Sequence, residues 1–196
     1  MKINFLKAMS VTLLIGGGSL LGYSGYHLAG QEMKEKRALE DAHEIVKAAE
    51  NKYPKKAAAV SYSFSEGEVV GILSIPKLKK KLPVIEGTQE EELEKGVGHY
   101  SDTKLPGQGD RIFLAGHRDT VFKSMGEIEK GDLLEIQLST GHHRYVVFEM
   151  FVVNETDLSV LESTSPNEIL TLSTCYPFEY LSSTEERYII NARRID

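Results

Sequence analysis

The chain has 196 residues, of which 41% are hydrophobic and 27% are charged, and its formal net charge is −6. These values are typical of an ordinary folded protein of one domain and argue against disorder throughout the chain. The acidic balance, with Lys and Arg spread along the sequence, argues against nucleic-acid binding because phosphate contacts need a basic surface. The single cysteine, Cys175, excludes an internal disulfide and a thiolate-rich zinc site.

The N-terminal segment predicts a membrane anchor. Residues 8–30 contain no Asp, Glu, Lys or Arg, and this stretch of about 23 residues approaches the roughly 20 that a helix needs to cross a bilayer. Tyr23 and Tyr26 suit a membrane interface, and Lys2 and Lys7 favour a cytoplasmic N-terminus. The sequence therefore predicts a transmembrane signal-anchor within residues 1–30, with the rest of the chain outside the cell.

A cleavable signal peptide is the competing interpretation of this segment. Its apolar region would be shorter and would end at a small-residue cleavage site. No convincing Ala-x-Ala site follows the apolar block from Val11 to Leu21, which favours an uncleaved anchor. Lys34, Lys36 and Arg37 lie on the far side and weaken the predicted orientation without reversing it.

Residues 31–60 predict a helical linker. From Gln31 to about Lys52 the residues are mostly good helix formers, and Tyr53-Pro54 ends the pattern because proline stops helices. A thin apolar stripe along this helix allows either a free stalk or packing against the domain that follows.

Residues 61–196 predict a domain made mostly of strands. Short β-rich or alternating segments are separated by turn signals, and a small acidic helix is expected from Glu90 to Lys95. The predicted strands cover residues 69–75, 82–85, 111–115, 133–138, 144–153, 169–174 and 187–192. Many short strands with little helix indicate a mostly β fold, an antiparallel barrel or sandwich.

Three residues could carry chemistry together. His117 and Cys175 both follow a predicted strand, and Arg187 opens the next one. A thiol nucleophile needs a partner that favours thiolate, and an attacked carbonyl needs a fixed cation or N–H groups. The pattern alone allows a Cys–His–Arg site, while a lone cysteine is more often a buried small hydrophobe. His99, flanked by glycines and an aromatic residue, is more simply interpreted as structural.

Three motifs in order resemble the sortase family. The segment Thr171-Leu172-Ser173-Thr174-Cys175-Tyr176-Pro177-Phe178 resembles the sortase active-site signature, most like that of class D. Residues 114–120, Leu-Ala-Gly-His-Arg-Asp-Thr, resemble the histidine motif, and residues 187–192 resemble the arginine strand. The similarity extends from about Gly71 to Ala192.

Two departures from the class D pattern stand out. Residues 181–186 replace a Gly-x-Ala-Pro element between the cysteine and the arginine, which leaves substrate preference within the class open. Gly109-Asp110-Arg111 replaces a commoner Gly-Asn pattern, and we expect little effect from it.

The resemblance implies a closed eight-stranded β-barrel with short helices, preceded by the transmembrane helix and the helical linker. It implies that Cys175 attacks a Leu-Pro-x-Thr-Gly/Ala-like sorting signal after Thr and forms a thioacyl enzyme. His117 would act as acid and base, Arg187 would stabilise the oxyanion, and Thr174 would contact substrate. No metal or organic cofactor is implied.

The implied partners are surface proteins with a C-terminal sorting signal, the amine of a lipid-linked cell-wall precursor, and the membrane. A pilin-polymerising sortase with a lysine acceptor is an alternative, although no second C-terminal hydrophobic helix follows the last strand as such enzymes often have. A catalytically silent extracellular binding module on the same barrel is the other alternative.

Overall fold

The computed structural model describes residues 2–50, 62–179 and 184–195. Two α-helices, three 3₁₀-helices and eight strands lie within these residues. The helices are α1 (Lys2–Glu50), α2 (Glu90–Leu93), η1 (Pro76–Leu78), η2 (Met125–Glu127) and η3 (Leu158–Leu161). The strands are β1 (Val69–Ile75), β2 (Lys80–Glu86), β3 (Val97–His99), β4 (Arg111–Ala115), β5 (Leu133–Leu138), β6 (Gly141–Asn154), β7 (Ile169–Tyr176) and β8 (Glu186–Arg194).

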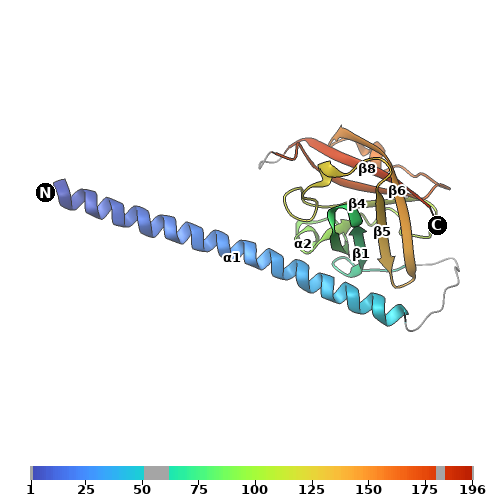
Figure 1. Cartoon of the computed structure of the whole chain (residues 1–196), viewed down its shortest axis with the longest axis horizontal. Coiled ribbons are helices and arrows are strands. Elements are labelled where there is room, and N and C mark those ends of the chain that lie inside the picture. The colour runs from blue at the N-terminus through green and yellow to red at the C-terminus, as the bar shows by residue number, and fades with distance from the viewer. Residues whose placement is uncertain (1, 51–61, 180–183, 196) are drawn as a thin grey trace.

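The strands close into a barrel in the order β1-β2-β3-β4-β7-β8-β6-β5, with β5 returning to β1. This confirms the expected closed eight-stranded barrel (Figure 1). The expectation of a wholly antiparallel sheet was wrong, because β2 pairs with β3 and β4 pairs with β7 in parallel. Parallel neighbours need a crossover connection, and the segment carrying α2 supplies one between β2 and β3.

The short strand β3 was not predicted, because two of the residues around it are glycines rather than β-branched residues. Close packing explains both glycines. A Cβ on Gly96 would lie 2.5 Å from the carbonyl oxygen of Pro83, and one on Gly98 would lie 2.5 Å from that of Gly87. The backbone of β3 can therefore approach the backbone of Pro83 and Gly87 only because Gly96 and Gly98 have no side chain.

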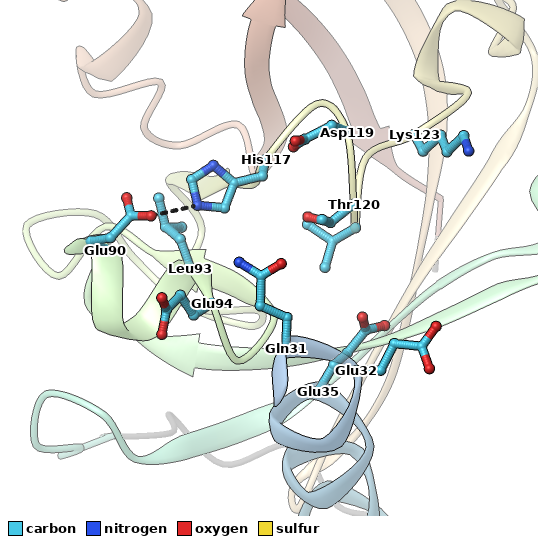
Figure 2. Close-up of a pocket in the computed structure, with 11 residues that line it drawn as sticks. Gln31, Glu32, Glu35, Glu90, Leu93, Glu94, His117, Asp119, Thr120 and Lys123 are labelled. Atoms are coloured by element: carbon cyan, nitrogen blue, oxygen red, sulfur yellow. Dashed lines mark ion pairs between the residues drawn. The ribbon is translucent and has the colours of Figure 1, made fainter. Parts of the chain in front are cut away.

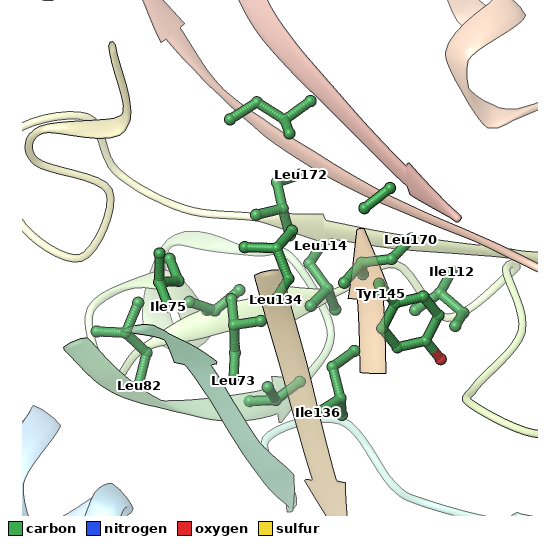
Figure 3. Packing of buried hydrophobic residues seen from close by; sticks show 14 of the residues in the cluster. Leu73, Ile75, Leu82, Ile112, Leu114, Leu134, Ile136, Tyr145, Leu170 and Leu172 are labelled. Atoms are coloured by element: carbon green, nitrogen blue, oxygen red, sulfur yellow. The ribbon is translucent and has the colours of Figure 1, made fainter. Parts of the chain in front are cut away.

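The barrel interior is filled by apolar side chains from its strands (Figure 3). In β5, buried residues alternate with half-buried ones, as strand geometry requires when one face meets the core. Leu134 and Ile136 point into the cluster beside Leu73 and Tyr145. Tyr145 is fully buried, and its hydroxyl donates to Glu168 Oε1 at 2.8 Å, so its polar end has a partner.

The C-terminal part of helix α1 packs on the barrel (Figure 1). The linker is therefore not a free stalk, which was the other possibility that its sequence allowed. Ala42 is 0% exposed, Val46 is 4% exposed, and both contact Ile72 of β1 in a second small core. Lys34 forms an ion pair with Glu94 just after α2. The helix runs without a break through the predicted boundary at residue 30.

The predicted transmembrane helix is not supported. Among the described residues, no helix combines the length and apolar content that crossing a membrane requires. Glycines and hydroxyl-bearing side chains interrupt the apolar residues of the 8–30 stretch and lower its mean hydropathy. The predicted boundary at residues 60 and 61 and the stop at Tyr53-Pro54 lie outside the described residues.

Candidate active site

Cys175 and Arg187 face each other across two neighbouring strands. Cys175 is the penultimate residue of β7, Arg187 is the second residue of β8, and the antiparallel register pairs them directly. Directly opposed residues in such a pair project to the same face of the sheet. Both side chains are partly exposed. The return of the chain after Cys175 therefore presents a thiol and a guanidinium at one end of the barrel.

His117 reaches the same end from the other side of β7. Strand β4 runs parallel to β7 with Ala115 opposite Ser173, and the N–H of Gly116 donates to the carbonyl oxygen of Ser173 at 3.1 Å. Cys175 lies two residues further along β7, and His117 lies two residues beyond Ala115, in the turn that follows β4. The parallel pairing thus places the turn of His117 at the end of the barrel where Cys175 pairs with Arg187, and the catalytic role of the three residues stays a prediction.

The turn at His117 requires a glycine before it. A Cβ on Gly116 would lie 2.8 Å from side-chain atoms of Val121 and Phe122, which fold back over it. The carbonyl oxygen of His117 accepts the N–H of Phe122 at 2.9 Å and closes this turn. Lys80 donates to the carbonyl oxygens of Thr120 and Val121 at 3.2 and 2.7 Å. Burial lowers the pKa of Lys80.

The segment after Cys175 is tied to the segment after His117. Arg118 donates from Nη1 to the carbonyl oxygen of Pro177 at 2.7 Å. Behind them, the rings of Tyr176 and Tyr188 stack at 5.9 Å, and Phe178 meets Tyr188 edge-on at 5.1 Å. Burial raises the pKa of Tyr188, and the neighbouring Tyr176 adds to this. These contacts brace the barrel end that carries the thiol.

The imidazole of His117 borders a cavity of about 520 Å³ between α1, α2 and its own turn (Figure 2). His117 Nε2 lies 3.4 Å from Glu90 Oε1. Glu90 is largely exposed, so this contact is weak and leaves the ring able to turn toward a substrate. Gln31 of α1 faces the ring from the opposite wall of the cavity.

Arg187 is held by three acceptors. Its Nη2 donates to Glu155 Oε2 at 2.5 Å, and its Nη1 donates to the carbonyl oxygens of Thr184 and Glu186 at 2.6 and 3.1 Å. The guanidinium therefore lies at the start of β8, beside the end of β6.

A second hollow, of about 290 Å³, lies on the face of the barrel that carries Arg187. Its floor includes Ala115, Ser173 and Ile189, and several residues within 153–161, at the end of β6 and in the connection that follows, contribute its wall. Ser173 and Cys175 share a face because alternate residues of a strand do so. We call this hollow the groove. Cys175 does not line it, but lies two residues beyond Ser173 on the same face and pairs with Arg187, which does line it.

Comparison with known proteins identifies this arrangement. Residues 73–195 match the model of the sortase domain. The chain belongs to the sortase family. Sortases are transpeptidases, so this sortase is an enzyme, and the barrel predicted from its motifs is the fold of its family.

The expected likeness to class D is confirmed. Sortase D of Bacillus subtilis (strain 168) is 36% identical over 195 residues, which cover 96% of this chain and 98% of that protein. A structure of a Clostridium perfringens Sortase D5 transpeptidase shares the fold, with a TM-score of 0.69, 24% identity, and coverage of 84% of this chain and 99% of that one. Clostridium perfringens sortase C with the C-terminal cell wall sorting motif has a TM-score of 0.62 at 26% identity, over 83% of this chain and 88% of that one.

The sortase places Thr174 inside the barrel. Thr174 is 4% exposed, and its hydroxyl donates to the carbonyl oxygen of Gly116 at 2.7 Å. Its direct partner is therefore the turn that carries His117, and contact of Thr174 with substrate stays a prediction.

His99 has the structural role that its glycine-rich setting favoured. It is 2% exposed, its Nδ1 lies 2.7 Å from Glu86 Oε2, and its Nε2 lies 3.0 Å from the carbonyl oxygen of Lys104. Both ring nitrogens thus have protein partners. Among the residues with described placement, no group of three or more His, Cys, Asp or Glu side chains is arranged to hold a metal ion.

Sequence reasoning did not single out Glu155 or Gln31 as site residues. Glu155 precedes Arg187 by 32 positions and follows a strand with no motif around it. Gln31 belongs to a helix far from His117 in the chain. Only the folded chain brings these side chains to the site, so no local signal marks them.

Proposed function

We propose that this sortase cleaves a Leu-Pro-x-Thr-Gly/Ala-like sorting signal after Thr and joins the protein to a cell-wall peptide amine. The observation that carries the proposal is the direct pairing of Cys175 with Arg187, with the turn of His117 on the neighbouring strand. A nucleophile, a cation and an acid–base group then lie at the same end of the barrel, with the cation lining the groove.

In the first half of the reaction, the thiolate of Cys175 attacks the carbonyl carbon of the signal threonine. The carbonyl oxygen gains negative charge, which the guanidinium of Arg187 and nearby backbone N–H groups stabilise. Collapse of this intermediate breaks the peptide bond and leaves a thioester on Cys175. His117 supplies the proton that the departing amine needs.

In the second half, an incoming amine attacks the thioester. His117 removes a proton from that amine, and the thiolate leaves as the new amide bond forms. Resolution by water instead of an amine gives hydrolysis as a side reaction. The cavity beside His117 offers space in which an amine could approach the imidazole.

The groove of about 290 Å³ suits an extended apolar peptide. Phe113, Ile189 and Leu161 line it, and Arg187 stands at its charged end. Bound in it, the Leu and Pro of a signal would contact apolar side chains while the scissile carbonyl approaches Cys175. The Clostridium perfringens sortase C structure with a sorting motif supports a signal peptide as the substrate of this fold.

We also propose that the catalytic domain works outside the cell, held at the membrane by the N-terminal segment, where surface proteins and lipid-linked wall precursor meet. Exposed apolar side chains along the first half of α1 support this placement, including Leu13, Leu14, Leu20 and Leu21. Fractionation and protease treatment of intact cells test it. Recovery of the protein in the cytosolic fraction, protected from external protease, would contradict it.

The activity is tested with the full chain and Leu-Pro-x-Thr-Gly and Leu-Pro-x-Thr-Ala peptides. Intact-protein mass spectrometry is expected to show an acyl adduct that Cys175→Ala removes. The faster peptide identifies the signal, and adding diamine or lysine-bearing acceptors separates wall anchoring from pilin polymerisation. A folded chain that forms no adduct with either peptide would instead favour the silent binding module.

A further inference from the structure

Glu155 is the carboxylate that holds the guanidinium of Arg187. The two charges meet at 2.5 Å between Glu155 Oε2 and Arg187 Nη2. The other two acceptors of Arg187 are backbone carbonyl oxygens, which any residue at positions 184 and 186 would supply. Glu155 is therefore the one of these three acceptors whose contact depends on the identity of a side chain.

Glu155 is presented from a well-defined backbone. Its N–H donates to the carbonyl oxygen of Glu185 at 2.6 Å, immediately after the last pair of the β6–β8 ladder, Asn154 with Glu186. The side-chain oxygen of Asn154 accepts the N–H and the hydroxyl of Thr156 at 3.0 and 2.6 Å. These bonds order the backbone where the chain leaves β6. The carboxylate of Glu155 is therefore already positioned beside Arg187.

Glu155 and Arg187 both line the groove of about 290 Å³. Within the described part of the chain, the three contacts of Arg187 use both Nη1–H groups and one Nη2–H group. The Nε–H and the second Nη2–H are left for a substrate. A guanidinium is a planar fork, so fixing one side of it fixes where the remaining donors point.

We propose that Glu155 is the positioning residue for Arg187, holding its free N–H groups toward the carbonyl oxygen that Cys175 attacks. This inference rests on the proposed function, in which Arg187 stabilises the oxyanion. Donors held in place before the reaction stabilise developing charge without reorganising at that moment. Without Glu155 the signal still binds along the groove, but the cation meets the carbonyl oxygen less often. The change therefore falls on kcat and leaves KM nearly constant.

The first test compares acyl-enzyme formation by full-length Glu155→Ala, Glu155→Gln and Glu162→Ala. Glu162 is an exposed residue of the same connection, its backbone carbonyl oxygen accepts from Arg111, and its carboxylate acts on Arg111 rather than on Arg187. We expect Glu155→Ala to lower kcat by roughly 10-fold with KM within about twofold of wild type. Glu155→Gln keeps an oxygen acceptor for Nη2–H and is expected to stay within about threefold.

The control Glu162→Ala is expected to match wild type in both constants. Two results would overturn the positioning role of Glu155. One is a Glu155→Ala variant with wild-type kcat. The other is an equal loss in the Ala and Gln variants accompanied by an equal fall in Tm, which indicates damage to the fold.

A second readout needs no substrate. In ¹⁵N spectra of the full chain, the Nε–H signal of Arg187, assigned with Arg187→Lys, reports how firmly the guanidinium is held. Its exchange with water is expected to be at least about fivefold faster in Glu155→Ala than in wild type, because local protection follows local order. Unchanged exchange would overturn the inference. An inactive wild-type chain would overturn only the proposed function, since this measurement decides the role of Glu155 separately.

Discussion

The hydroxyl of Thr174 donates to the carbonyl oxygen of Gly116 at 2.7 Å, which joins the residue before Cys175 to the residue before His117. The N–H of Gly116 donates to the carbonyl oxygen of Ser173, which lies next to Thr174 in β7, at 3.1 Å. Gly116 is thus bonded through both of its backbone groups to β7. This pair of bonds holds the turn of His117 against the strand that carries Cys175.

Replacing Thr174 tests this connection. Thr174→Val keeps the shape of the side chain but leaves the buried Gly116 carbonyl oxygen without its hydroxyl donor. We expect a loss of about 1–3 kcal/mol in the free energy of unfolding, measured by urea denaturation. We also expect kcat for acyl-enzyme formation to fall by roughly 10-fold, because the turn of His117 loses a restraint.

Thr174→Ser is the matched control, since its hydroxyl can make the same bond. It is expected to retain most of the stability and of kcat. If the Val variant instead binds the sorting peptide much more weakly at unchanged stability, direct contact of Thr174 with substrate would be the better explanation.

The second prediction concerns the shape of the cation at position 187. Arg187→Lys keeps the positive charge, but an ammonium cannot bridge Glu155, two carbonyl oxygens and a substrate as a planar fork does. We expect kcat for thioacylation to fall by about 100-fold or more, as for loss of an oxyanion donor. Circular dichroism and Tm are expected to stay close to wild type because the side chain is partly exposed. Wild-type turnover by the Lys variant would rule out a specific role for the guanidinium.

The third prediction concerns the buried pair of Glu86 and His99, which joins β2 to β3. Glu86→Leu leaves the imidazole Nδ1 buried without its partner. We expect this change to lower the free energy of unfolding by about 3 kcal/mol. Glu86→Gln can still donate from its amide to Nδ1 and is expected to cost less than half of that. Equal stability of the Leu variant and wild type, by urea denaturation, would show that the pair contributes nothing.

The fourth prediction is a pH dependence centred on Asp110, which joins the β3–β4 and β6–β7 connections. Partial burial raises the pKa of Asp110, but hydrogen bonds from Arg111, Thr164, Ser163 and Ser165 outweigh this and hold the pKa below its usual range. A carboxyl whose folded pKa is depressed stabilises the fold above its unfolded pKa of about 3.9 and loses that contribution as pH falls through the folded pKa.

Asp110→Asn is therefore expected to lower Tm at pH 7, and the difference from wild type is expected to shrink steadily as the pH falls below about 4. Thermal melts of the two proteins across this range measure it. A constant difference in Tm at every pH would mean that the charge of Asp110 is not what stabilises these connections.

The strands with clear alternation could be predicted from local pattern. In β5 every second residue is buried, and β7 and β8 carry the segments from Ile169 and from Arg187 that the sequence indicated. Strand β3 and the parallel pairings escaped prediction. Strand β3 depends on the close approach of Gly98 to Gly87, and β4 depends on its pairing with β7, so each involves two separate segments of the chain.

By itself, the sequence determined the family and most of the strands, because contiguous motifs and local alternation carry both. The same motifs predicted Cys175, His117 and Arg187 as the catalytic residues. Only the tertiary structure decided that Thr174 is bonded to Gly116, that Glu155 holds Arg187, and that α1 packs on β1. The physical reason is distance along the chain. A hydrogen bond or packing contact between segments far apart in sequence depends on the register of strands, and no local pattern of residues encodes that register.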